Sequence, residues 1–273
     1  MTAPSAIPTG ARKALAFTYD FQGRRMTKTV SNWTGSAWSL SLQRKFLYDD
    51  WNLITETDNS NVMQRQFMWG TDLSGTRRGA GGVGGLVKVY DATTSKHLFP
   101  GFGGNGDVTV LADGATGTSQ ANYEYGPFGE LLRITGSWSR TNPFRFSTKY
   151  QDDESDFIYF GYRYYNPNIG RWATRDPIEE AGGKNEFTFV RNNATDEWDY
   201  LGKFPNPFAH DPGPPNKVPP PTGLFPKCDI AFRCAPTFLS IQHCGLVIDT
   251  GRGVYGLDGG GGKTATDTGT PGQ

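Results

Sequence analysis

The chain has 273 residues, of which 27 are Lys or Arg and 27 are Asp or Glu, so its formal net charge is zero. This balance disfavours binding to nucleic acid or to an acidic membrane surface, because both need a basic footprint. The 36 glycines, 18 Phe, 12 Tyr and 7 Trp favour an all-β fold, since glycine supplies turns and aromatic side chains pack on pleated sheets. The same composition disfavours a helical bundle.

Targeting signals and cysteines bear on where the chain works. It has no run of eighteen apolar residues, and residues 1–16 lack the pattern of a secretory signal peptide. We therefore expect no membrane span, and a chain that stays in the cytoplasm until a specialised system exports it or displays it at the cell surface. The three cysteines, Cys228, Cys234 and Cys244, fit a reducing cytosol at least as well as a disulfide scaffold.

A short motif recurs along the first half of the chain. Residues 19–26 (YDFQGRRM), 48–54 (YDDWNLI) and 125–132 (YGPFGELL) each predict a strand, a tight turn and a second strand, and Tyr90-Asp91 is a weaker fourth example. Repeated hairpins predict a sheet in which each unit buries its face only against its neighbours.

Two stretches between these hairpins invite functional readings that the residues do not favour. Glycine-rich residues 79–86 are followed by a strand pattern at 86–90, whereas a phosphate loop needs a Lys-Ser/Thr pair opening a helix, so we predict a structural loop. The acidic run of Asp152, Asp153, Glu154 and Asp156 is interpreted as the solvated tip of a hairpin rather than a metal site. We expect no cofactor and no bound metal.

The most informative stretch covers residues 145–203. Apolar and polar residues alternate from 157 to 165, which predicts a half-buried strand, and turn residues at 166–170 end it. This stretch resembles the core-associated segment of RHS/YD-repeat proteins, the bacterial shells that carry a variable C-terminal toxin. The residues that match are Gly161-Tyr162-Arg163-Tyr164-Tyr165-Asn166-Pro167, Gly170-Arg171-Trp172, Arg175-Asp176-Pro177, Asn192-Asn193 and Asp199-Tyr200-Leu201-Gly202.

The resemblance implies an extended, curled antiparallel sheet of YD-repeat hairpins, part of a shell that spirals around a hollow interior. We expect YD-repeat hairpins over residues 1–136, the RHS repeat-associated core over 137–203, a Pro-rich linker over 204–226 and a variable tail with a small β-hairpin over 227–273. Because about three repeats cannot close a shell, we expect a terminal piece with exposed β-edges near residues 14–30. Its partners would be the remainder of the shell or its own C-terminal tail, and an immunity protein.

Two carboxylates are the best candidates for chemistry. In the RHS family a pair of aspartates cuts the toxin from the shell, and the resemblance places this pair at Asp176 and Asp199 and the cut at Lys203-Phe204. Two close carboxylates share a proton, so one can polarise the scissile carbonyl while the other activates water, and Arg175 would help to set which of them is charged.

Three residues depart from the family pattern. Glu179 replaces a glycine, Tyr200 a proline, and Lys203 the Leu or Met before the cut, so a long cationic side chain stands where a leucine pocket is expected. The alternative is that Asp176 and Asp199 only form turns, in which case the chain is an inactive structural fragment.

The tail leaves three interpretations open. His243 beside Cys244 faintly resembles the His strand of permuted papain-like hydrolases, which makes Cys228 or Cys234 a candidate thiolate nucleophile and His243 its base. A zinc site is conceivable by ligand type, but the spacing matches no standard finger. The third interpretation is a packed hairpin without activity, with its turn at residues 249–253.

Overall fold

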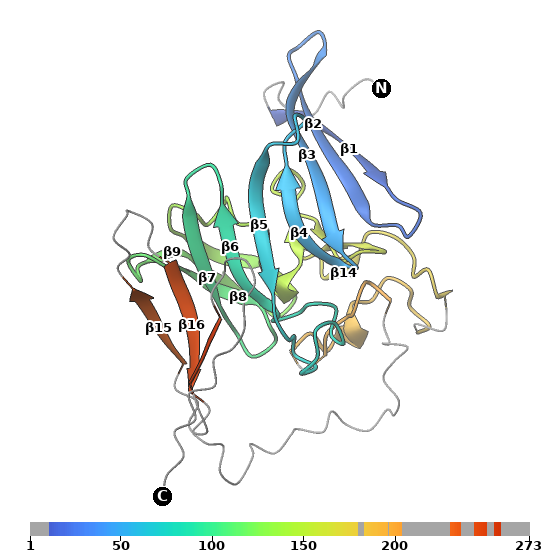
Figure 1. Cartoon of the computed structure of the whole chain (residues 1–273). Helices are drawn as coiled ribbons and strands as arrows, with labels where there is room; N and C mark the ends of the chain where they lie inside the picture. The colour runs from blue at the N-terminus through green and yellow to red at the C-terminus, as the bar shows by residue number, and fades with distance from the viewer. Residues whose placement is uncertain are drawn as a thin grey trace, which may run out of the picture. The chain divides into compact units, whose positions relative to one another are not determined.

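The computed structural model describes residues 11–179, 183–195 and 197–203, together with the backbone of three strands nearer the C-terminus (Figure 1). The chain divides into two units, residues 1–210 and 211–273, which we describe separately. The expected Pro-rich linker at 204–226 lies outside the described residues.

The first unit is built on a ten-stranded sheet in which each strand pairs antiparallel with the next along the chain. The fold is therefore all-β, as the composition predicts. The strands are β1 (Lys13–Tyr19), β2 (Arg25–Trp33), β3 (Trp38–Asp49), β4 (Asn52–Thr57), β5 (Met63–Trp69), β6 (Leu86–Asp91), β7 (Lys96–Phe102), β8 (Val108–Asp113), β9 (Ser119–Tyr125) and β10 (Leu131–Thr135).

The hairpin turns depend on aspartate side chains. Between β1 and β2, Asp20 Oδ1 accepts hydrogen bonds from the backbone N–H groups of Gln22 and Arg24, both at 2.9 Å. A carboxylate that bonds backbone two residues on mimics a turn and fixes its direction. Asp58 does the same for β4–β5 and Asp91 for β6–β7. The hairpins predicted at residues 19–26, 48–54, 90–91 and 125–132 all lie at connections between neighbouring strands.

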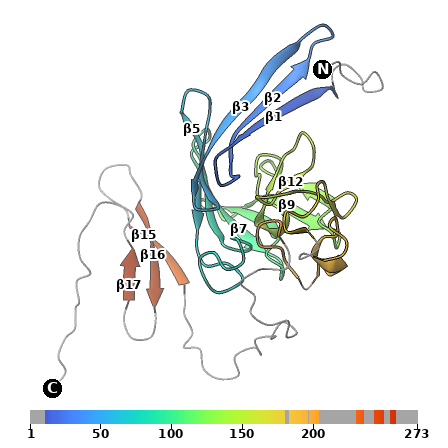
Figure 2. The same ribbon diagram turned by 90° about the vertical axis from the view of Figure 1, so that its right-hand side faces the viewer.

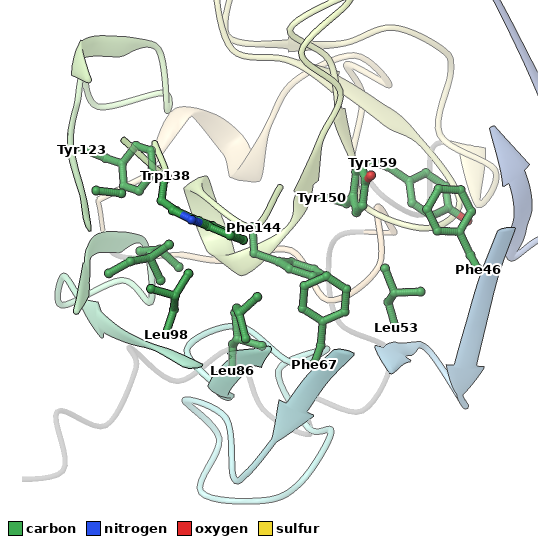
Figure 3. Close-up of a cluster of buried hydrophobic side chains, with 14 residues drawn as sticks. Phe46, Leu53, Phe67, Leu86, Leu98, Tyr123, Trp138, Phe144, Tyr150 and Tyr159 are labelled. Atoms are coloured by element: carbon green, nitrogen blue, oxygen red, sulfur yellow. The ribbon is translucent and has the colours of Figure 1, made fainter. Parts of the chain in front are cut away.

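The concave face of the sheet holds the main hydrophobic core. The sheet curves around the segment from residue 137 onward (Figure 2). In Figure 3, Phe67, Leu86 and Leu98 of the sheet point toward Trp138 and Phe144 of that segment. The Phe67 and Phe144 rings pack edge to face, with centroids 4.9 Å apart. Such aromatic pairs stabilise the contact by about 0.5–1.5 kcal/mol beyond burial of their area.

The enclosed segment forms a small sheet with its own core. Four short strands pair in order: β11 (Tyr150–Gln151), β12 (Ile158–Tyr159), β13 (Tyr164–Asn166) and β14 (Arg171–Trp172). Two 3-10 turns flank them, η2 (Phe146–Thr148) and η4 (Val190–Asn192). Phe160, Tyr165, Trp172 and Phe189 pack together, with the Tyr165 and Phe189 centroids 4.3 Å apart.

The acidic run was predicted to be a solvated hairpin tip, and for Asp152 this is wrong. Its side chain is fully buried and bonds Arg25 Nη1 at 2.6 Å and Lys28 Nζ at 2.8 Å, both from β2. Lys28 also bonds Glu154 at 2.5 Å. The cations lie more than a hundred residues away, so the local sequence pattern could not reveal them. Asp153 and Asp156 are exposed, as predicted, and Asp153 pairs with Arg145.

Aromatic rings complete the surroundings of Arg25. Its guanidinium lies 4.6 Å from the Tyr150 ring centroid and 4.8 Å from those of Phe46 and Tyr159. Desolvated cation–π contacts add to the attraction of Asp152. This cluster ties β2 of the large sheet to the enclosed segment.

The exposed edge expected near residues 14–30 is at β1, because β2 is paired on both sides.

The glycine-rich stretch is a loop between β5 and β6, in agreement with the prediction from sequence. No helix among the described residues is long and apolar enough to cross a membrane.

The C-terminal unit contains one more strand than expected. Its sheet has three antiparallel strands, β15 (Ile230–Ala235), β16 (His243–Asp249) and β17 (Val254–Leu257). β16 and β17 form the predicted hairpin, and β15 pairs with the other side of β16.

The buried ion cluster gives a stability prediction. Replacing Arg25 with Met leaves Asp152 buried with one cation fewer, so we expect the free energy of unfolding to fall by about 3–5 kcal/mol. Arg133→Met, which breaks the exposed ion pair with Glu124, is the matched control and should cost about 0–1 kcal/mol. Urea unfolding of the three chains measures both changes, and similar losses in the two variants would contradict the prediction.

Candidate functional site

The candidate site is an arginine held between two aspartates. Arg163 lies between β12 and β13, Asp176 follows β14, and Asp199 follows η4. Arg163 Nη2 is 2.7 Å from Asp176 Oδ2 and 3.6 Å from Asp199 Oδ2. Because both oxygens contact the same nitrogen, they are separated by no more than the sum of these distances, about 6.3 Å. The fold thus brings Asp176 and Asp199 together.

Arg163 is almost fully buried, and each nitrogen of its guanidinium contacts an oxygen atom. Its Nε donates to the carbonyl oxygen of Gly202 at 2.6 Å, and its Nη1 donates to that of Glu186 at 3.0 Å. The guanidinium carbon lies 4.1 Å from the centroid of the Trp172 ring. A planar guanidinium can bond in several fixed directions at once while stacking on a ring, which an ammonium cannot do. Arg163 therefore fixes the two aspartates and the backbone at Gly202 in one arrangement.

Asp199 bonds the backbone immediately before the peptide bond that is expected to be cut. Its Oδ1 accepts hydrogen bonds from the N–H of Gly202 at 2.6 Å and of Lys203 at 2.9 Å. Its Oδ2 is buried and accepts no hydrogen bond from the described residues. Burial raises the pKa of this carboxyl, and the opposing effects of Arg163 and the two N–H groups are smaller. Asp199 is thus suited to keep a proton.

Asp176 plays two structural parts at once. Its Oδ1 accepts a hydrogen bond from the N–H of Ile178 at 3.0 Å, the turn that the sequence predicts, while its Oδ2 contacts Arg163. Glu179, which replaces a glycine of the family pattern, has a φ of +54°. That left-handed conformation is the one for which glycine is best suited.

Lys149 joins the site to the glycine-rich loop. Its buried ammonium donates to the carbonyl oxygens of Gly81 at 2.6 Å and Tyr200 at 3.1 Å. Gly81 has a φ of +64°, and a Cβ at this position would overlap the Tyr200 carbonyl. Burial lowers the pKa of Lys149 to about 8, and the smaller effect of Asp199 raises it. The loop between β5 and β6 therefore supports the segment that carries Asp199.

Arg175 was expected to set the charge of the aspartate pair, but the structure places Arg163 between them instead. The Arg175 side chain is 81% exposed and its Nε lies 3.6 Å from Glu186. In the sequence Arg163 stands out only as part of a motif, and no role could be predicted for Lys149. The available signal was a charged residue inside an aromatic, alternating strand pattern, which indicates a cation that is buried with partners.

The other candidate residues belong largely to parts of the chain that are described by backbone alone or not at all. Phe204 and Cys228 lie outside the described residues. In the C-terminal sheet, position 234 is paired with Cys244 and position 235 with His243. Paired positions share a face and successive positions alternate, so this register puts Cys234 and His243 on opposite faces.

Comparison with known proteins places the fold. No family model matches the chain. It is 42% identical over 60 residues to the toxin protein Tse5 of Pseudomonas aeruginosa, which covers 22% of this chain and 5% of that protein. It is 26% identical over 184 residues to the tRNA3(Ser)-specific nuclease WapA of Bacillus spizizenii, which covers 65% of this chain and 7% of WapA.

A solved structure shares the fold of this chain. The crystal structure of TcdB2-TccC3-TEV superposes with a TM-score of 0.54 and 22% identity over 74% of this chain and 9% of its own length. The chain is thus similar in sequence to parts of bacterial toxin proteins, and it shares the fold of this solved structure. It spans only 5% of the length of Tse5 and 7% of the length of WapA.

The buried Lys149 predicts a pH effect on stability. Its pKa is 10.5 in an unfolded chain and about 8 in the folded one, so between these values only the unfolded state holds the proton. Stability that depends on Lys149 is therefore lost as pH falls through 8 and gained as pH rises. We expect the free energy of unfolding of the native chain to rise, relative to that of Lys149→Met, by about 1.4 kcal/mol per unit between pH 8 and 10. Urea unfolding at several pH values tests this, and a difference independent of pH would contradict it.

Proposed function

We propose that this chain is a shell segment of an RHS-type toxin that cuts itself between Lys203 and Phe204. The observation that carries the proposal is that Arg163 contacts Asp176, Asp199 and the carbonyl of Gly202, while Asp199 holds the N–H of Lys203. The acidic pair is therefore anchored within one residue of the peptide bond that the resemblance identifies. The residues after the cut would be the released cargo.

The chemistry follows from the environments of the two carboxyl groups. Asp199, with its raised pKa and an Oδ2 that accepts no hydrogen bond from the described residues, is suited to donate a proton to the Lys203 carbonyl oxygen. Asp176, ion-paired with Arg163, would take a proton from water. The water oxygen adds to the carbonyl carbon, the C–N bond to Phe204 breaks, and the proton taken by Asp176 passes to the leaving amine. The new carboxyl group at Lys203 returns its proton to Asp199, so the products are a carboxylate at Lys203 and an amino group at Phe204, with no cofactor consumed.

The shell role rests on the sheet. Among the described residues β1 pairs only with β2, so its other side is an open edge, and an edge of this kind can add the strand of a neighbouring shell segment. The structural neighbour described above contains TcdB2 together with TccC3, which supports a partner that continues the shell. Homology to toxins supports export by a dedicated system.

Fragment formation tests the cleavage. We expect the purified chain to yield fragments of residues 1–203 and 204–273, which intact mass spectrometry would identify. Asp176→Asn and Asp199→Asn should each slow the reaction at least about a hundredfold, because each removes an acid or base. Asp58→Asn is the matched control, since Asp58 forms a similar turn far from Arg163 along the chain. A native chain that stays intact under all conditions would contradict the self-cleavage and leave both aspartates with a structural role only.

A further inference from the structure

Lys203 contacts an aromatic ring through its ammonium. Its Nζ lies 3.2 Å from the centroid of the Tyr162 ring, well inside the roughly 6 Å range of cation–π attraction. No ion pair among the described residues involves Lys203. The side chain that the sequence marked as a poor fit for a leucine pocket therefore has a partner of another kind.

The backbone fixes this contact from both sides. Tyr162 N–H donates to the Leu201 carbonyl oxygen at 3.0 Å, and Asp199 holds the N–H of Lys203. The neighbouring Arg163 bonds the Gly202 carbonyl. The chain at 201–203 thus runs beside Tyr162, and a side chain at position 203 can fold back over the ring.

The ring itself is supported and accessible. Tyr162 packs on Trp51 with centroids 4.7 Å apart, and Gly161 leaves room for that indole. Tyr162 keeps 39% of its surface exposed, so an ammonium can lie on the ring and still contact water. An aliphatic side chain here would lack the electrostatic attraction of the ring.

We propose that Tyr162, supported by Trp51, recognises a cationic side chain at position 203 and is a specificity-determining residue for the self-cleavage. This rests on the cleavage proposed above and adds the class of residue that the site accepts before the bond. Lys and Arg at 203 are selected over Met and Leu.

Two measurements test it. The first is the cleavage rate of full-length chains with Lys203 native or changed to Arg, Met or Leu, each with native Tyr162 and with Tyr162→Leu. We expect Arg to be accepted and Met or Leu to slow cleavage about three- to thirtyfold, the range that corresponds to a cation–π contact. With Tyr162→Leu the preference should disappear. Equal rates for Lys203 and Lys203→Met, or the same slowing by Tyr162→Leu in both, would overturn the proposal.

The second measurement does not need cleavage. In the Asp176→Asn chain labelled with ¹³C-lysine, the ε-methylene protons of Lys203 should be shifted upfield by the ring current of Tyr162, with Lys203→Met assigning the signal. The shift should vanish in Tyr162→Leu and be restored in Tyr162→Phe, which keeps the ring. A native chain that is not cut but shows this shift rejects the self-cleavage and keeps the recognition. A chain that is cut without the shift and without a preference for cations rejects the recognition alone.

Discussion

The buried guanidinium of Arg163 is the constraint on which the site depends. One side chain contacts two aspartates, two backbone carbonyls and the face of Trp172. A buried cation without such partners would cost several kcal/mol, so these groups must assemble together or not at all. The arrangement of Asp176, Asp199 and the chain at 202–203 is therefore a consequence of satisfying one charge.

The same solution appears at the other end of the enclosed segment. Arg25 of β2 is buried among aromatic rings and neutralised by Asp152, just as Arg163 is stacked on Trp172 and neutralised by Asp176. In both places the charges join parts of the chain that lie apart in the sequence. Apolar side chains form the two cores, while these pairs specify which strand faces which turn. The fold thus combines a nonspecific core with two specific anchors.

Local features could be predicted from the sequence and long-range ones could not. Several hairpins follow from turn residues such as Asp20, which bonds the backbone two residues ahead, so the pairing of neighbouring strands could be predicted. The two site aspartates came from a family resemblance. Arg163 and Lys149 were missed because their roles depend on partners such as Asp199 and Gly81, far away in the chain. The burial of Asp152 was missed for the same reason, since an acidic run looks solvated until its cations are placed.

The close approach of Gly81 to Tyr200 has a consequence for timing. The loop that carries Gly81 belongs to the large sheet, and the backbone of Tyr200 can take its place only when that loop is present and bare of a side chain. The segment that holds Asp199 is therefore built against a surface made much earlier in synthesis. Any reaction at this site therefore has to wait until the large sheet has folded.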